Sequence, residues 1–230
     1  MDKLLLIFQS SLGRKFIMGI TGTALVAFIV IHMIGNLQIF LGPDALNGYA
    51  KLLKAKAELL WAFRLGLLGM IGLHLWAAIS LAIENRKARP KRYDKEGTIQ
   101  ASYASRTMVM SGLIVISFAI FHILHFTAQV THPKYHEMKT MYKGEEVHDV
   151  YQMVVAGFSN PWISGFYILS VGLLCIHMSH GVSSMFQSLG IMNRNTEPVF
   201  KLGAKGLSAV VFLGMAAVPV SVLVGLVGFE

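Results

Sequence analysis

Cysteine and charged residues are scarce in this sequence. The single cysteine, Cys175, excludes an internal disulfide, and no CxxCH stretch is present to attach a c-type haem covalently. Charged residues make up 14% of the 230 residues, against roughly 25% in an ordinary soluble domain. So little charge cannot cover a surface that faces water, which excludes a soluble globular domain.

Long apolar segments take the place of charge. Hydrophobic residues make up 54% of the chain, and the hydrocarbon core of a bilayer requires about 20 apolar residues in a helix. Five segments predict transmembrane helices, at residues 16–40, 60–83, 107–130, 163–187 and 205–228. We therefore expect an all-α fold, an integral membrane bundle of five helices in a single domain over residues 1–230. The first helix is too long for the apolar core of a signal peptide and no A-x-A-like site follows it, so we expect no cleaved leader.

The formal net charge of +8 is explained by topology rather than by nucleic-acid binding. Basic residues gather before the first predicted helix, between the second and third, and between the fourth and fifth. These segments hold 13 of the 20 lysines and arginines: Lys3, Arg14, Lys15, Arg86, Lys87, Arg89, Lys91, Arg92, Lys95, Arg106, Arg194, Lys201 and Lys205. Because basic residues favour the cytoplasmic side, the N-terminus is predicted to be cytoplasmic and the C-terminus to lie outside.

The two outer links carry signals of local structure. In GPDALNGYAKLLKAKAEL, four apolar residues have helical spacing, which predicts an amphipathic helix in the membrane interface: Leu46, Tyr49, Leu52 and Leu53. The alternative is a solvated loop. The second link, about 131–162, is the most polar part of the chain and ends in VVAGFSNPW, where Asn160 followed by Pro161 predicts the start of a helix.

Five histidines fall at membrane depth: His32, His74, His122, His177 and His180, and His125 lies one turn beyond His122. Ionisable residues are costly in hydrocarbon and usually mark a site, although a neutral imidazole bonded to a neighbouring helix is the simpler alternative. At 1.5 Å per residue, His32 and His122 fall in the outer half of the bilayer, and His74 and His180 in the inner half. Depth therefore predicts two pairs of histidines, one in each half.

Glycines repeat the same pairing. Gly22 follows Thr21 in the first helix and Gly112 follows Ser111 in the third, each with nine residues before its histidine. The second and fourth helices carry a glycine eight residues before His74 and His180. Since glycine lets a flat cofactor or another helix approach the backbone, the spacing favours pairing the first helix with the third and the second with the fourth.

Paired neutral imidazoles from facing helices are typical of bis-histidine b-type haem. With both axial positions filled, the expected chemistry is electron transfer rather than oxygen binding. A rival hypothesis reads the two HxxH pairs as one four-histidine metal site. The difference in depth between His122 and His180 argues against a single ion.

Several motifs resemble one known family. These are TGTALVAFIVIHMIGNLQIFLG, LHLWAAI, YASRTMVMSGLIVISFAIFH, VVAGFSNPW and HMSHGVSSMFQSLG. Together they resemble the five-helix, dihaem cytochrome b subunit of succinate:quinone oxidoreductases, the cytochrome b558 group, which includes quinol:fumarate reductases. The resemblance runs through at least the fourth helix, and HG followed by SxFQSLG is its most specific part.

The resemblance implies two haem b groups between the first four helices, with one axial ligand from each. By position these ligands are His32, His74, His122 and His180. The spacing from Ser111 and Gly112 selects His122 over His125, and the glycine after His180 selects it over His177. His125 and His177 are then not ligands. Each would support a ligand, bind a haem propionate, contribute to a quinone site, or simply pack against its neighbours.

The same resemblance implies partners and a substrate. A flavoprotein, where dicarboxylate chemistry occurs, and an iron–sulfur protein would dock on the cytoplasmic face of a bacterial membrane, and the chain would pass electrons to or from a quinone, usually menaquinone. Such complexes serve as succinate dehydrogenase, in the tricarboxylic acid cycle, or as fumarate reductase. Glu58 and then Asp44 are candidates for the quinone-site carboxylate after the first helix, with a surface charge as the alternative. Some dihaem fumarate reductases carry a glutamate two residues before the fourth ligand, where this chain has Met178, so a proton route there is not expected.

Three basic residues at the predicted inner ends of helices could bind haem propionates: Arg14, Lys15 and Arg106. Topology alone explains their positions equally well. Two other functions stay open. One is a cytochrome b subunit of a hydrogenase or formate dehydrogenase, and the other is a non-redox transporter whose histidines relay protons.

Overall fold

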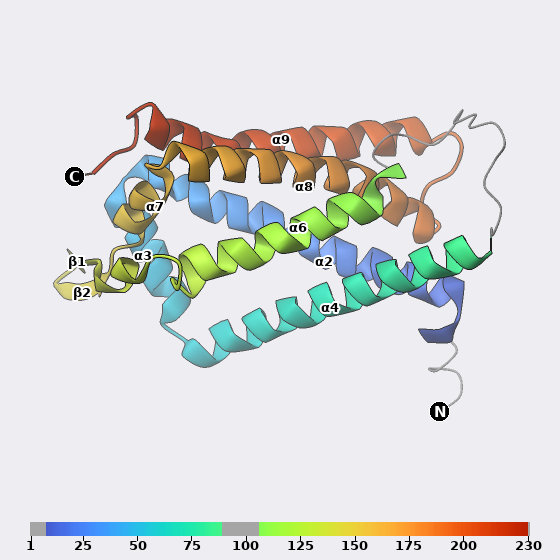
Figure 1. The fold of residues 1–230 in the computed structure, drawn as a ribbon, viewed down its shortest axis with the longest axis horizontal. Helices are drawn as coiled ribbons and strands as arrows, with labels where there is room; N and C mark the ends of the chain where they lie inside the picture. Colours follow the sequence, from blue (N-terminus) through green and yellow to red (C-terminus); the bar gives the residue numbers. More distant parts are fainter. Residues whose placement is uncertain (1–7, 89–105, 230) are drawn as a thin grey trace. The chain divides into compact units, whose positions relative to one another are not determined.

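The computed structural model describes residues 8–88 and 106–229. Five of the basic residues used for the topology prediction lie outside these ranges: Lys3, Arg89, Lys91, Arg92 and Lys95. Within them, five helices are long and apolar enough to cross a membrane, which confirms this part of the prediction and is compatible with an integral membrane protein. They are α2 (Ser11–Leu37, extended by η1, Gln38–Leu41), α4 (Ala57–Lys87), α6 (Met108–His122, extended by the π-helical η2, Ile123–Thr127), α8 (Pro161–Ser188) and α9 (Glu197–Leu223) (Figure 1).

Local signals fix the ends of the last two membrane-length helices. Asn160 Oδ1 accepts a hydrogen bond from the backbone N–H of Trp162 at 2.9 Å, so α8 begins at Pro161, as its capping sequence predicts. The fifth helix begins at Glu197, eight residues before the predicted start, and ends at Leu223. Its end is set by Gly225, whose φ of +74° is a left-handed conformation that favours glycine.

The chain divides into two compact units. Unit 1 comprises Met1–Phe28, Arg64–Gly112 and Ile176–Ser208, and unit 2 comprises Ile29–Phe63, Leu113–Cys175 and Ala209–Glu230. Each of the five long helices contributes one segment to each unit. The histidines can therefore be assigned to a unit by residue number alone.

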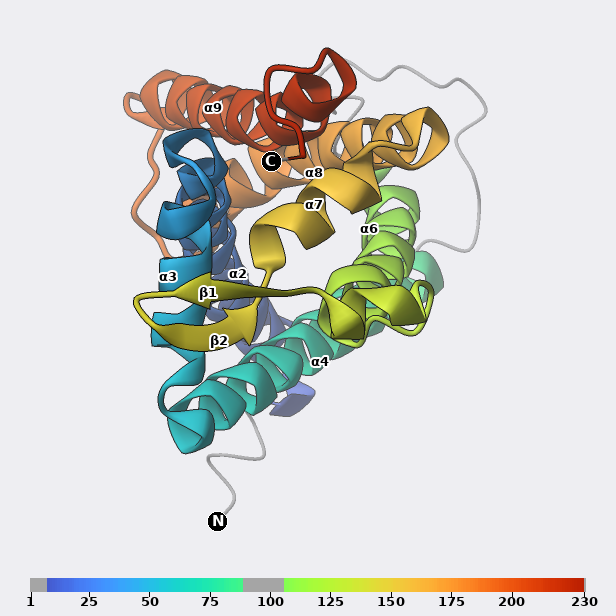
Figure 2. The same ribbon diagram turned by 90° about the vertical axis from the view of Figure 1, so that its left-hand side faces the viewer.

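Unit 2 includes a cap built from the two predicted outer links. It consists of α3 (Pro43–Lys54), η3 (Pro133–Glu137), the antiparallel strands β1 (Lys139–Tyr142) and β2 (Glu145–His148), and α7 (Val150–Phe158). Figure 2 shows α3 beside the hairpin and α7. The hairpin turns at Lys143 and Gly144, both with positive φ, the conformation that a tight two-residue turn requires.

A buried polar contact joins α3 to the start of α7. Asn47 Nδ2 donates to Asp149 Oδ1 at 3.0 Å, and Asn47 Oδ1 accepts from the backbone N–H of Tyr151 at 3.0 Å. Asp149 also caps α7 by accepting from the backbone N–H of Gln152. Because a buried amide left unpaired is costly, these bonds fix how α3 and α7 pack.

The helix predicted at α3 is confirmed, and the alternative of a loop is wrong. The burial of its apolar residues differs along the helix, however. Leu46 is buried in the cap and Tyr49 packs against Gly35, whereas Leu52 and Leu53 are exposed. The two exposed leucines lie near the C-terminal end of α3.

Candidate functional site

The structure groups the histidines as the depth estimate does. His32 on α2, His122 on α6 and His125 on η2 belong to unit 2. His74 on α4 and two histidines on α8, His177 and His180, belong to unit 1.

In unit 2, the two predicted ligands face each other. The rings of His32 and His122 have centroids 5.7 Å apart and planes at 83°. Two imidazoles bound to opposite sides of one metal ion, with bonds of about 2 Å, have centroids about 6 Å apart. Nδ1 of His122 is buried and has no hydrogen-bond partner among the described residues. A buried ring nitrogen without a partner is costly unless something binds it, so this site fits a metal-centred cofactor.

Aromatic side chains surround His122. The rings of Phe118, Phe126 and Tyr167 lie with their centroids 5.9–6.1 Å from its own. Phe118 also packs edge-on against Tyr167. Such a shell excludes water and leaves the imidazoles as the polar groups offered to a flat aromatic ligand.

In unit 1, hydroxyl groups orient two histidines in the same way. Thr21 Oγ1 lies 3.1 Å from Nδ1 of His74, and Ser111 Oγ lies 3.0 Å from Nδ1 of His177. Each hydroxyl also donates to a carbonyl of its own helix, at Ile17 for Thr21 and at Met108 for Ser111. Its oxygen is then available to accept a hydrogen bond from Nδ1–H, and the opposite nitrogen, Nε2, keeps its lone pair for a ligand role.

The glycine beside each hydroxyl lies against the same imidazole. A Cβ added to Gly22 would lie 3.5 Å from Cε1 of His74, and one added to Gly112 would lie 3.4 Å from Cε1 of His177. The sequence spacing linked Gly112 to His122, but the two residues belong to different units, and the ring beside Gly112 is that of His177. Gly22 likewise lies beside His74 rather than His32.

His180, the predicted ligand of α8, has different surroundings. Its Nε2 lies 3.1 Å from Oγ of Ser184, one turn further along the same helix. Of the two histidines of α8, His177 thus has the environment that matches His74.

His125 is fully buried and makes contacts that the sequence did not predict. Its Nδ1 lies 2.9 Å from the hydroxyl of Tyr167, and its Nε2 lies 3.4 Å from the hydroxyl of Tyr135. Burial raises the pKa of Tyr135 above its ordinary value, so this phenol stays protonated at neutral pH and can donate. Neither tyrosine was singled out in the sequence, since their meeting depends on how η3 and α8 pack.

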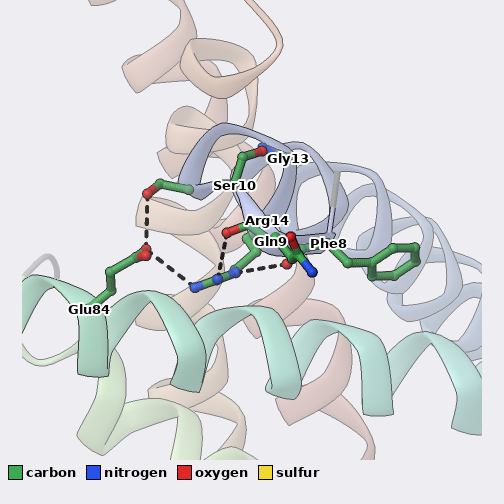
Figure 3. A network of polar contacts seen from close by, with 7 residues as sticks. Phe8, Gln9, Ser10, Gly13, Arg14 and Glu84 are labelled. Carbon is green, nitrogen blue, oxygen red and sulfur yellow. Dashed lines mark hydrogen bonds and ion pairs between the residues drawn. The ribbon is translucent and has the colours of Figure 1, made fainter. Parts of the chain in front are cut away.

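Arg14, a predicted propionate partner, is held by the protein itself (Figure 3). Its guanidinium donates to the carbonyls of Phe8 and Gln9 at 3.0 and 2.8 Å and pairs with Glu84 at 3.3 Å. These contacts join the start of α2 to the end of α4. The other two basic candidates, Lys15 and Arg106, are exposed.

The two carboxylates predicted for a quinone site are both exposed, and each lies in the first turn of a helix, Asp44 in α3 and Glu58 in α4. A negative charge in the first turn is stabilised by the helix dipole, which accounts for both residues without a ligand.

Among the described residues, no three histidine, cysteine or acidic side chains are placed to hold one metal ion. Comparison of the chain with protein-family models, with curated proteins and with solved structures finds no match.

Proposed function

We propose that this protein is an electron-transfer cytochrome of a membrane, with one b-type haem bound between α2 and α6 in unit 2 and a second between α4 and α8 in unit 1. The facing imidazoles of His32 and His122 are the observation that carries this proposal, together with the buried Nδ1 of His122, which has no hydrogen-bond partner among the described residues. A bis-imidazole haem bound there would accept and give up single electrons with no open position for oxygen.

For unit 1, we propose His74 and His177 as the axial ligands, in place of the His180 expected from the sequence. The support is the matched contacts of Thr21 with His74 and of Ser111 with His177. Each hydroxyl fixes the orientation and tautomer of its imidazole, so that both Nε2 atoms are presented as ligands. His180, bonded within its own helix, has a supporting role in this arrangement.

The motif resemblance extends the proposal to the complex and its substrate. The chain would anchor the flavoprotein and iron–sulfur subunits of a succinate dehydrogenase or fumarate reductase to the cytoplasmic face of a bacterial membrane, and would exchange electrons with a quinone, with menaquinone as the expected species. By the depth estimate, His32 and His122 would lie in the outer half of this membrane and His74 in the inner half. Because the helix dipole accounts for Glu58 and Asp44, the quinone site is not assigned to either.

The test is a reduced-minus-oxidised spectrum with haem quantitation on the purified complex and on single alanine variants of His32, His74, His122, His177 and His180. We expect two haems per chain in the unchanged protein, and one in each of the variants at His32, His74, His122 and His177. His180→Ala should retain both, as should the control His136→Ala, which changes an exposed histidine of η3. Retention of both haems in His177→Ala with loss of one in His180→Ala would restore the ligand expected from the sequence.

The identity of the partners separates the related functions. Co-purification with a flavoprotein and an iron–sulfur subunit supports the proposed complex, whereas co-purification with a hydrogenase or formate dehydrogenase subunit supports the other cytochrome. A colourless purified protein would favour a histidine-containing transporter and contradict both.

A further inference from the structure

The buried imidazole of His125 lies between two phenols of unit 2. The hydroxyl of Tyr167, from α8, is bonded to Nδ1, and the hydroxyl of Tyr135, from η3, approaches Nε2. Both tyrosines are themselves buried. In the neutral imidazole that fits these contacts, Nδ1–H donates to Tyr167 while Nε2 accepts from the hydroxyl of Tyr135.

Two features of the backbone distinguish the surroundings of His125. His125 lies in the π-helical turn η2, a rare widened turn that occurs often at functional sites. On another side, α7 approaches the ring with Gly157, where an added Cβ would lie 3.3 Å from Cε1 of His125. The titratable side chains in contact with His125 are Tyr167 from α8, Tyr135 from η3 and His132 from the link before η3, and His122 of α6 is near enough to interact with it electrostatically. From α7, Gly157 lies against the ring.

A chain of contacts leads from the proposed outer haem site to the surface. On the inner side of His125, the ring of Tyr167 contacts that of His122, with centroids 5.9 Å apart. On the other side, the ring of His132 lies 5.1 Å from His125 and is stacked on Tyr135 at 5.1 Å. His132 is partly exposed, so this end of the chain of contacts reaches water.

An electron added at His32 and His122 would make the site one charge unit more negative. In a low-dielectric setting this change would raise the proton affinity of a nearby base. The aromatic neighbours of His122, Phe118, Phe126 and Tyr167, are uncharged at neutral pH. The nearest base along the contacts described above is His125, joined to His122 through Tyr167.

We infer that His125 is the proton-accepting group of the outer redox site, loaded from the surface through Tyr135. This inference rests on the proposed function. For each electron that arrives, one proton leaves water, Tyr135 passes its own hydroxyl proton to Nε2 of His125 and regains one from the surface side, and the imidazole becomes an imidazolium. On oxidation the proton returns by the same route, so one proton and one electron enter or leave together.

The test is a redox titration of the intact complex at several pH values, with the outer haem assigned by its loss in His32→Ala. In the unchanged protein, the midpoint potential of the outer haem should fall as pH rises, by up to about 59 mV for each tenfold fall in proton concentration. In His125→Gln, which keeps polar groups facing the two phenols but has no titratable proton, this dependence should disappear. The control His136→Gln should behave like the unchanged protein. A pH dependence retained in His125→Gln with both haems bound would overturn the inference.

Tyr135→Phe provides a second test if His125→Gln loses haem. This variant keeps His125 and its bond to Tyr167 but removes the hydroxyl that faces Nε2. The equilibrium pH dependence should remain, while proton uptake after rapid reduction, followed with a pH-indicator dye, should slow at least tenfold. Unchanged uptake would refute the route through Tyr135. Unchanged protein that contains no haem, or only one, would instead refute the proposed function itself.

Discussion

Ser111 Oγ lies 3.0 Å from Nδ1 of His177, and this contact repeats the one between Thr21 and His74 on the opposite pair of helices of unit 1. Both hydroxyls precede a glycine that lies against the same imidazole. Unit 1 therefore presents two imidazoles oriented by the same device, and the first prediction concerns these hydroxyls.

Removing the hydroxyls should alter the inner haem while leaving the fold intact. In Ser111→Ala and Thr21→Val the imidazole loses the partner of Nδ1, which typically weakens metal binding by about 10- to 100-fold. We expect a shifted midpoint potential and a changed low-spin electron paramagnetic resonance signal for one haem, with the other unchanged. Redox titration and spectra of the purified complex measure this.

Matched variants show whether the effect comes from losing the hydrogen bond to the histidine or from a change in helix packing. Ser111→Thr and Thr21→Ser keep the hydroxyl and should restore the original signal. Ser117→Ala removes a hydroxyl that donates to a carbonyl of its own helix, and it should leave the two haems unaltered. A shift of equal size in this control would refute a specific role for Ser111 and Thr21.

A second prediction concerns Gly157, which lies against two rings. An added Cβ would be 2.7 Å from two atoms of the Phe126 ring, a distance that forces a rigid aromatic side chain or the helix to move. Overpacking of this kind costs about 1–3 kcal/mol, so Gly157→Ala should lower the thermal stability of the protein in detergent.

The matched control is Gly165→Ala, because an added Cβ there has no atom within 4 Å among the described residues. It should leave the melting temperature within a degree or two of the original value, since alanine is a better helix former than glycine. Equal stability of the two variants would show that α7 does not pack tightly on Phe126.

A third prediction concerns the pH dependence of the cap. Burial, followed by the nearby charge of Lys54, lowers the pKa of His148 below its ordinary value, and this residue lies outside the membrane-length helices. The folded cap therefore favours the neutral imidazole, and the unfolded segment binds protons more readily. The stabilisation is complete above the ordinary pKa of about 6.5 and decreases as pH falls through the range between the two values.

Hydrogen exchange of the β1–β2 amides, compared at pH 7.5 and pH 5, measures this effect. Exchange should become faster at acid pH than the intrinsic rate predicts, because protonation of Nε2 of His148 removes the acceptor of the hydrogen bond from the side-chain amide of Gln129. His148→Gln should remove most of this dependence. Protection that is equal at both pH values in the unchanged protein would contradict it.

The sequence shows which helices carry histidines, but the contacts of each histidine depend on how the helices pack. Counting along two helices placed His32 and His122 at a similar depth, and the structure brings their ring centroids to 5.7 Å. Along α8 the same reasoning could not choose between His177 and His180. Residues three apart on a helix differ in direction by only about 60°, so a small rotation of the helix decides which one meets Ser111.

The sequence by itself determined the five membrane-length helices, the start of α8 at Pro161 and the helical character of α3, since apolar length, capping and periodicity are properties of contiguous residues. Tertiary structure alone decided that Gly112 lies beside His177 and that Arg14 is held by Glu84. It also decided that Tyr135 and Tyr167 meet at His125. These contacts join segments far apart in the chain, and they depend on how each helix is rotated about its axis and on the path of the links, which no local pattern specifies.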